Sequence, residues 1–357
     1  MRTSPRSTTG KTTNAGRVHQ HPTPLRRRPQ SCTQVIIQML KAYFESTRET
    51  LKSLTDTFDF LWPTTAAMWN LRWQVQGLVG AYPQITDKEL QGRFVAGTGI
   101  SGANLKRSCI DQSWERQQQR FAEILLTSTF ALYESWCDQI LSSLGHSNSE
   151  WSKRLQFPTE YDSGGTIPKR GVGKLLPDLL THRSPFLSAA FYPKFASRPK
   201  CDRMKIESYL QCYRYFKEVR NCLMHNGGLA DKKLLDAATS FAKCANTTSL
   251  GTKEVPEHAS ATLDAPISLS LRGVVGFSDI VTRLMLTLDA ELMQAEKAED
   301  ECVKLWRRRF DDEKIGLPSN AVAKANKVNR LAKKLGLPLP AKSSDFEQFL
   351  RAHGFVV

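Results

Sequence analysis

An arginine and a histidine stand five residues apart near the end of one predicted helix, and their types suit acid–base chemistry on a phosphate. The stretch YRYFKEVRNCLMHNGG, residues 213–228, contains Arg220, Asn221 and His225. An imidazole exchanges a proton near neutral pH, whereas a guanidinium is a permanent cation that binds phosphate oxygens in a bidentate fork. These side chains could support attack of a ribose 2′-hydroxyl on the adjacent phosphate, with His225 moving the proton and Arg220 stabilising the developing negative charge.

The position of Arg220 on the predicted helix is unusual. At about 100° per residue, Arg220 falls in the middle of an apolar arc that includes Tyr213 and Phe216. A guanidinium cannot lose its charge, so a buried one needs a carboxylate, a partner subunit or a phosphate. His225 points about 140° away from Arg220. The following Asn-Gly-Gly, residues 226–228, predicts a left-handed stop that could let the two side chains converge.

Arg220, the polar Asn221, three further residues and His225 resemble the R-x4-H motif of the HEPN superfamily. The resemblance is specific in this helix and extends loosely over residues 112–297, leaving the two ends and residues 146–201 outside it. It implies a metal-independent endoribonuclease that uses no cofactor and leaves 2′,3′-cyclic phosphate ends. The resemblance also implies a homodimer in which the two motif helices cross. Arg220 and His225 of both subunits are then the catalytic residues, and Asn221 supports them.

The same resemblance implies partners and a setting. RNA is the expected substrate, a second copy the expected subunit, and an antitoxin or other regulatory protein a further expected partner. Stand-alone proteins of this kind often act in phage defence or toxin–antitoxin growth arrest. Because such a link is made by analogy alone, it is an expectation about biology and not about chemistry.

Three alternatives stay open at this point. In the first, Arg220 pairs with Glu134 or Asp138 on a neighbouring helix, and His225 is a helix-terminal residue whose charge favours the helix dipole. In the second, the chain has the HEPN fold but serves as a non-catalytic interaction or adaptor module. In the third, the protein binds nucleic acid through its basic ends, which predicts binding that weakens steeply with salt.

Positive charge is concentrated at the two ends of the chain. The 357 residues carry a formal charge of +15, yet residues 1–30 hold seven Arg and Lys and no acidic residue. Residues 303–342 hold eleven basic residues and three acidic ones. The chain therefore divides into a basic tail (1–30) expected to be disordered, a nearly neutral HEPN-like body (31–302) and a basic helical appendix (303–357).

The spacing of apolar residues predicts an all-α fold. Helices are expected at 33–58, after Pro63, and at 112–144, 203–225, 232–245 and 274–297, with two short helices in the appendix. Residues 146–201 are rich in proline, glycine and basic residues and predict a long irregular insertion with short local structure. The fold class is an up-and-down helical bundle carrying that insertion, whose Arg and Lys are expected to gather RNA together with those of the appendix.

The remaining composition narrows the class of protein. The eight cysteines form no C-x-x-C pair and are expected to be reduced thiols in the cytoplasm. No apolar run has the length of a membrane span, so no membrane is expected as a partner. The sequence GTGISG, residues 97–102, fits the dinucleotide-binding G-x-G-x-x-G but precedes a long predicted helix, so we interpret it as a turn. No metal-ligand spacing is present around the cysteines and histidines.

Overall fold

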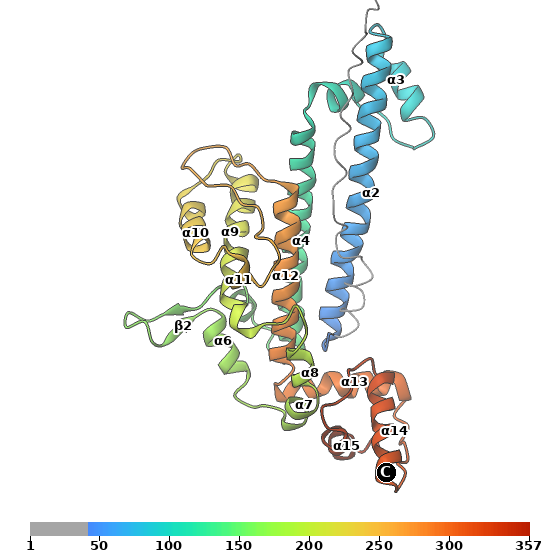
Figure 1. The fold of residues 1–357 in the computed structure, drawn as a ribbon, viewed down its shortest axis with the longest axis vertical. Coiled ribbons are helices and arrows are strands. Elements are labelled where there is room, and N and C mark those ends of the chain that lie inside the picture. Colours follow the sequence, from blue (N-terminus) through green and yellow to red (C-terminus); the bar gives the residue numbers. More distant parts are fainter. Residues whose placement is uncertain (1–41) are drawn as a thin grey trace, which may run out of the picture.

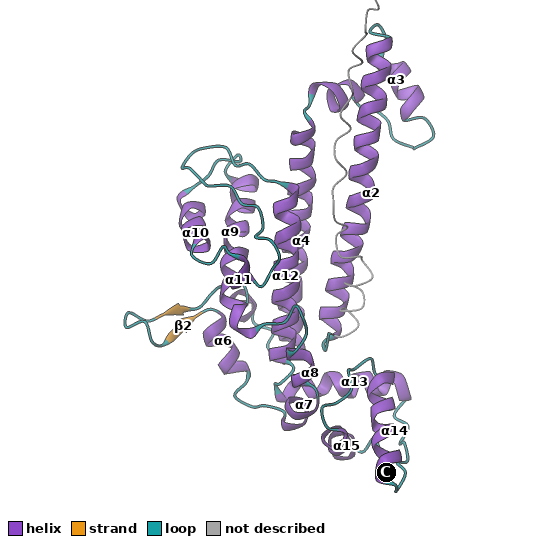
Figure 2. Cartoon of the chain, viewed as in Figure 1, coloured by secondary structure: helices purple, strands orange, loops and turns teal. Residues whose placement is uncertain are grey.

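The computed structural model describes residues 42–357, and the fold is helical throughout this part (Figures 1 and 2). The predicted tail 1–30 and the predicted helix start at Thr33 lie outside the described residues. The first half of the described chain contains α2 (Glu45–Ala81), α3 (Asp87–Phe94), η1 (Arg107–Asp111), α4 (Trp114–Ser143), α5 (Ser149–Arg154), α6 (Val172–Leu179), α7 (Pro185–Ala190) and α8 (Tyr192–Ala196). The second half contains η2 (Arg203–Lys205), α9 (Ile206–His225), α10 (Lys232–Ala242), α11 (Thr247–Leu250), α12 (Leu271–Leu292), η3 (Glu296–Ala298), α13 (Glu299–Phe310), α14 (Ala321–Lys334) and α15 (Ser343–Ala352).

The all-α prediction is confirmed, and the strands of the described residues form a single small hairpin, β1 (Glu160–Tyr161) and β2 (Pro168–Arg170). The helices predicted at 112–144, 203–225, 232–245 and 274–297 correspond to α4, α9 with η2, α10 and α12. The two short helices of the appendix are α14 and α15. Helical periodicity located these elements because each buries one apolar face.

One helix prediction was wrong. The sequence placed a helix start after Pro63, but α2 runs without interruption from Glu45 to Ala81 with Pro63 inside it. Proline removes one helical hydrogen bond, and that loss is local. Helix α2 also packs on α4 beyond Pro63, where the ring of Trp69 lies 4.8 Å from that of Trp114, so tertiary packing outweighs the local preference.

The centre of the bundle is an aromatic cluster shared by α4, α9 and α12. The ring of Phe277 on α12 stacks on Phe216 of α9 at 4.6 Å and lies 5.1 Å from Phe130 of α4. Tyr213 of α9 lies 4.9 Å from both Phe130 and Tyr133. These contacts fix one face of α9 against α4 and α12, which is the face on which the sequence also places Arg220.

A buried carboxylate joins the start of α2 to α12. Asp289 is fully buried and accepts hydrogen bonds from the backbone amides of Tyr43 (2.9 Å) and Phe44 (3.0 Å). Its second buried neighbour is Arg198, whose guanidinium lies 3.5 Å away. Asp289 therefore satisfies backbone donors at the start of α2 that have no acceptor within the helix.

The segment 146–201 contains α5 to α8 and the β1–β2 hairpin, and its buried residues belong to the main core. Leu175, Leu176 and Leu179 of α6 are buried there. Buried residues of α14 and α15, including Val328, Phe346 and Phe349, belong to the same core. A separate small core of Val75, Leu90, Leu105 and Cys109 closes the far end of the α2–α4 arm, next to α3.

Candidate functional site

Helix α9 ends where the sequence predicted, and its end is built from the Asn-Gly-Gly stop. His225 is the last helical residue, and Gly227 and Gly228 follow with φ of 61° and 81°. The amide of Gly228 and that of Asn226 both donate to the carbonyl of Cys222 at 3.0 Å. Glycine adopts positive φ without a steric penalty, so this stop holds the end of α9 in a fixed place.

Arg220 is half-buried in the apolar face of α9, and its charge is left without a carboxylate. Its Nε is buried and has no hydrogen-bond partner. Its Nη1 donates to Oδ1 of Asn221 over 3.4 Å, at the long end of hydrogen-bond distances. No ion pair joins Arg220 to any acid in residues 42–357. A partly buried guanidinium with unpaired donors can form strong, charge-assisted hydrogen bonds with an anion.

Glu218 organises the polar side chains around Arg220. The Glu218 side chain is buried and accepts from Arg214 Nη2 at 2.5 Å and from Asn221 Nδ2 at 3.0 Å. Arg214 also lies over the ring of Phe157, with 4.5 Å between guanidinium and ring centre. Because the Asn221 amide nitrogen is held by Glu218, its carbonyl oxygen is turned toward Arg220.

The alternative in which Arg220 pairs with an acid of α4 is wrong. Glu134 is engaged by Lys217, whose Nζ lies 3.1 Å from Glu134 Oε1 and 2.7 Å from Gln156 Oε1. Lys217 stands one turn before Arg220 on α9 and reaches the acid first. Arg220 therefore keeps its cationic charge unpaired within the described chain.

His225 lies at the exposed end of α9 and is not brought to Arg220 within one chain. It is exposed, and no hydrogen bond, ion pair or ring contact joins it to another residue between 42 and 357. The preceding residue of the same helix, Met224, is 58% exposed. An apolar side chain beside His225 is thus uncovered.

Tyr213 adds a second unpaired polar group to the same face of α9. Its hydroxyl is buried and has no hydrogen-bond partner in the described structure. Burial raises the pKa of Tyr213 well above its ordinary value, with Glu134 and Cys137 adding to the shift and the Arg214 and Arg220 charges opposing it. The phenol is therefore a neutral group at physiological pH, and Arg220 is close enough to affect it electrostatically.

The segment that follows α5 lies along α9. Phe157 contacts Arg214, Gln156 contacts Lys217, and Thr159 donates its backbone amide to Glu207 near the start of α9 at 2.9 Å. These contacts hold the segment between α5 and the hairpin along α9 from Glu207 to Lys217. The helices α13 to α15 instead lie at the other end of α12 (Figure 1), remote from His225.

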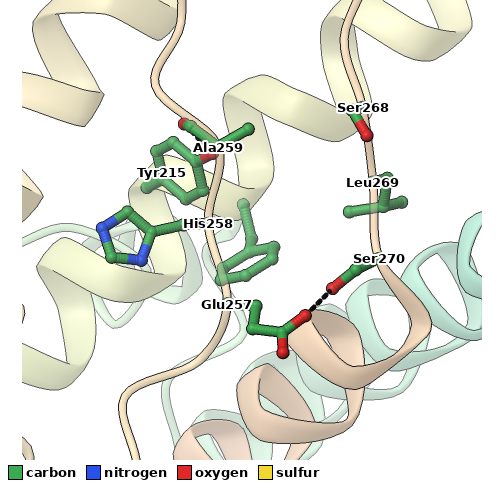
Figure 3. A pocket seen from close by; sticks show the side chains of 8 residues that line it. Tyr215, Glu257, His258, Ala259, Ser268, Leu269 and Ser270 are labelled. Atoms are coloured by element: carbon green, nitrogen blue, oxygen red, sulfur yellow. Dashed lines mark hydrogen bonds between the residues drawn. The ribbon is translucent and has the colours of Figure 1, made fainter.

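A hollow of about 220 Å³ on another face of α9 contains Glu257, His258, Ser268 and Ser270, residue types that occur in hydrolases. Figure 3 shows the His258 ring turned away from Ser270. Ser270 donates to Glu257 Oε2 at 2.7 Å and accepts from Gly273 N at 2.9 Å as the N-cap of α12. The polar groups of these residues hold the segment between α11 and α12 onto α9 and α12. The hollow therefore does not assemble a nucleophile–base pair.

The chain matches no family model, and no curated protein or solved structure matches it. The candidate site therefore stands on its own residues. Within residues 42–357 no cluster of histidine, cysteine and acidic side chains could hold a metal ion, and the seven cysteines found there are free thiols. Among the same residues no helix combines the length and apolarity that crossing a membrane requires.

The sequence singled out Arg220, Asn221 and His225 but missed Glu218. The structure joins Arg220, Asn221, Glu218 and Arg214 into one group and leaves His225 apart from it. The signal for Glu218 was present, since it stands four residues after Arg214 and three before Asn221, the separations at which helical side chains meet.

Proposed function

We propose that this protein is a metal-independent endoribonuclease that acts as a homodimer. The observation that carries the proposal is the unpaired, half-buried guanidinium of Arg220, with its buried Nε, beside an Asn221 that is held in place. A charge in that position is costly unless an anion or a partner group reaches it. RNA phosphate is the anion that the R-x4-H resemblance implies.

In this reaction the 2′-hydroxyl of one ribose attacks the adjacent phosphorus, the bond to the 5′-oxygen of the next nucleotide breaks, and a 2′,3′-cyclic phosphate remains. His225 of one subunit accepts the proton of the 2′-hydroxyl, and His225 of the second subunit donates a proton to the leaving 5′-oxygen. Arg220 stabilises the negative charge that develops on the phosphate oxygens. Asn221, fixed by Glu218, directs its carbonyl oxygen toward the Arg220 guanidinium and limits its orientations.

The homodimer accounts for the separation of Arg220 and His225 within one chain. In a pair of crossed α9 helices, His225 of one subunit can approach Arg220 of the other. Two observations support such a contact: His225 is exposed without a partner among the described residues, and the neighbouring Met224 is an uncovered apolar side chain. Burying Met224 against the second subunit would favour the contact.

The segment beside α9 supports RNA as the substrate. Lys153 and Arg154 of α5 and Lys169 and Arg170 of β2 give positive charge to the segment that packs along α9, and neutralising phosphates is the main source of RNA affinity. The appendix α13 to α15 lies too far along the bundle to share this role in the same subunit (Figure 1). Regulation by an antitoxin or another protein, and a role in phage defence or growth arrest, belong to the same proposal.

The test is cleavage of RNA by the purified protein in EDTA, with the ends of the products identified. We expect wild type to cut and to leave 2′,3′-cyclic phosphates, and Arg220→Ala and His225→Ala to be inactive. Arg309→Ala and His182→Ala are the controls, because both residues are exposed and lie outside α9, in α13 and between α6 and α7. Cleavage that needs a metal, that leaves 5′-phosphates, or that persists in both site variants contradicts the proposal and favours a non-catalytic binding module.

A further inference from the structure

The outer face of α2 between Phe60 and Ala81 is exposed and carries no charge. Every exposed position in this range is apolar, small or an amide, and its one charged residue, Arg72, is half-buried and donates to the carbonyl of Gln112 at 2.5 Å. At about 100° per residue, these exposed positions all fall within about 80° of Asn70. We call this surface the α2 stripe; it is about 30 Å long at 1.5 Å per residue.

Large aromatic side chains in the α2 stripe face solvent. Phe60 is 69% exposed and Trp73 is 59% exposed. Trp73 is supported from behind by Trp69, at 5.6 Å, and Trp69 in turn packs on Trp114 of α4 at 4.8 Å. Figure 1 shows that α2 and α4 extend as an arm from the rest of the bundle, with α3 at the far end. A contiguous uncharged patch of this length on a soluble surface marks a contact.

The pattern of large and small residues in the α2 stripe complements itself. When two copies of α2 pack antiparallel about Asn70, each residue lies level with the one equally far on the other side of Asn70. Trp73 then lies level with Ala67 of the second copy and close to its Ala66. Pro63 lies level with Gly77 of the second copy. Trp73 and Pro63 therefore each meet a small residue, as in close helix packing, while Trp62 at the edge of the stripe lies level with Leu78.

The chemistry at the two ends and the centre of the α2 stripe also fits a two-fold contact. Phe60 lies level with Gly80 of the second copy, so its ring has room to pack against the opposite backbone. Asn70 meets its own copy, and two amide side chains can donate to and accept from each other. No like charges oppose one another along the stripe, so nothing electrostatic resists pairing of identical surfaces.

From this pattern we infer that the α2 stripe binds the α2 stripe of a second copy of the chain, antiparallel and centred on Asn70. The inference does not rest on the proposed ribonuclease activity. Helices α2 and α9 lie on different sides of α4 (Figure 1), so the α2 contact is separate from a contact between motif helices. A chain that uses both contacts associates beyond a dimer.

A cysteine cross-link tests the geometry. Asn70→Cys places a thiol on the two-fold axis, so we expect it to form a disulfide-linked dimer under mild oxidation. Lys52→Cys is the matched control, because Lys52 is exposed and lies on the same line of α2, about five turns away. Its two copies are expected about 54 Å apart and should stay unlinked. Equal linkage of both variants, or of neither, overturns the inference.

The native mass in solution tests the contact independently. Ala67→Glu places charge against Trp73 of the second copy, and we expect the measured mass to fall by half. Ser53→Glu, at an exposed position of α2 outside the stripe, should leave the mass unchanged. Both substitutions preserve good helix formers, and circular dichroism verifies folding. A wild type with the mass of one chain, or a mass unchanged by Ala67→Glu, overturns the inference and assigns the stripe to residues 1–41 or to another protein.

Discussion

Arg198 and Arg220 are both withdrawn from solvent, but their surroundings differ. Arg198 donates from Nε to the carbonyl of Phe195 at 2.8 Å and from Nη2 to that of Leu286 at 2.9 Å, and it lies 3.5 Å from Asp289. Arg220 has a single long hydrogen bond to Asn221, and its Nε has no partner. A buried cation that pairs with a carboxylate of the same chain supports the fold. A buried cation without such a carboxylate can instead bind an anionic ligand.

The largest effect is expected at Arg198. Arg198→Ala leaves the buried carboxyl group of Asp289 without its cation, and we expect the free energy of unfolding to fall by about 3–5 kcal/mol. Urea unfolding measures the loss. Arg272→Ala is the control, because Arg272 pairs with Glu254 on the exposed surface and should matter little. A loss as small as that of the control would show that the Arg198–Asp289 pair does not support the fold.

Arg220→Ala is expected to reverse that pattern. Since Arg220 has no carboxylate partner, we expect the free energy of unfolding to change by less than about 1 kcal/mol. RNA cleavage should fall by at least about 100-fold, the usual effect of removing one group that stabilises transition-state charge. Urea unfolding and initial cleavage rates are measured on the same preparation. A stability loss equal to that of Arg198→Ala would remove the distinction between the two arginines.

Glu218→Gln should lower both the stability of the fold and the rate of cleavage, each by a smaller amount. The substitution keeps the shape of the side chain but removes the charge that holds Arg214, so we expect a stability loss of about 1–2 kcal/mol. Cleavage should fall by about tenfold, because Asn221 and Arg220 lose their fixed orientation. Glu134→Gln, which releases Lys217 instead, is the matched control for cleavage. Unchanged cleavage with reduced stability would make Glu218 purely structural.

Asp279 is a partly buried carboxylate with two cationic neighbours, so its contribution to stability should depend on pH. Burial opposes ionisation of Asp279, but Lys200 and Arg283 outweigh it and lower its pKa below the ordinary 3.8. The ionised form therefore stabilises the fold above that pH, and the contribution is lost as the pH falls through the lowered pKa. Melting temperatures of wild type and Asp279→Asn should differ modestly at neutral pH and converge in acid. A difference that grows in acid contradicts this sign.

Long elements with strong periodicity could be predicted from the sequence, and so could the end of α9. The helix start predicted after Pro63 was wrong, because the local helix preference of the residues does not reveal that α2 packs along α4. Short local structure was predicted within 146–201, but its helices could not be located, since segments such as α6 depend on burying Leu175 and Leu179 in a core supplied by other parts of the chain. The spacing of Glu218 from Arg214 and Asn221 was visible in the sequence, but its burial was not, and its partner Arg214 packs on Phe157 of that same segment.

The most direct test of the central claim is the dependence of cleavage on the 2′-hydroxyl. Wild-type protein in EDTA is given one RNA with ordinary ribose and the same RNA with 2′-O-methyl ribose at every position. Attack by the 2′-hydroxyl predicts that wild type cuts the ordinary RNA alone and that Arg220→Ala cuts neither RNA. Cleavage of the methylated RNA, or equal cleavage of the ordinary RNA by wild type and Arg220→Ala, would contradict it.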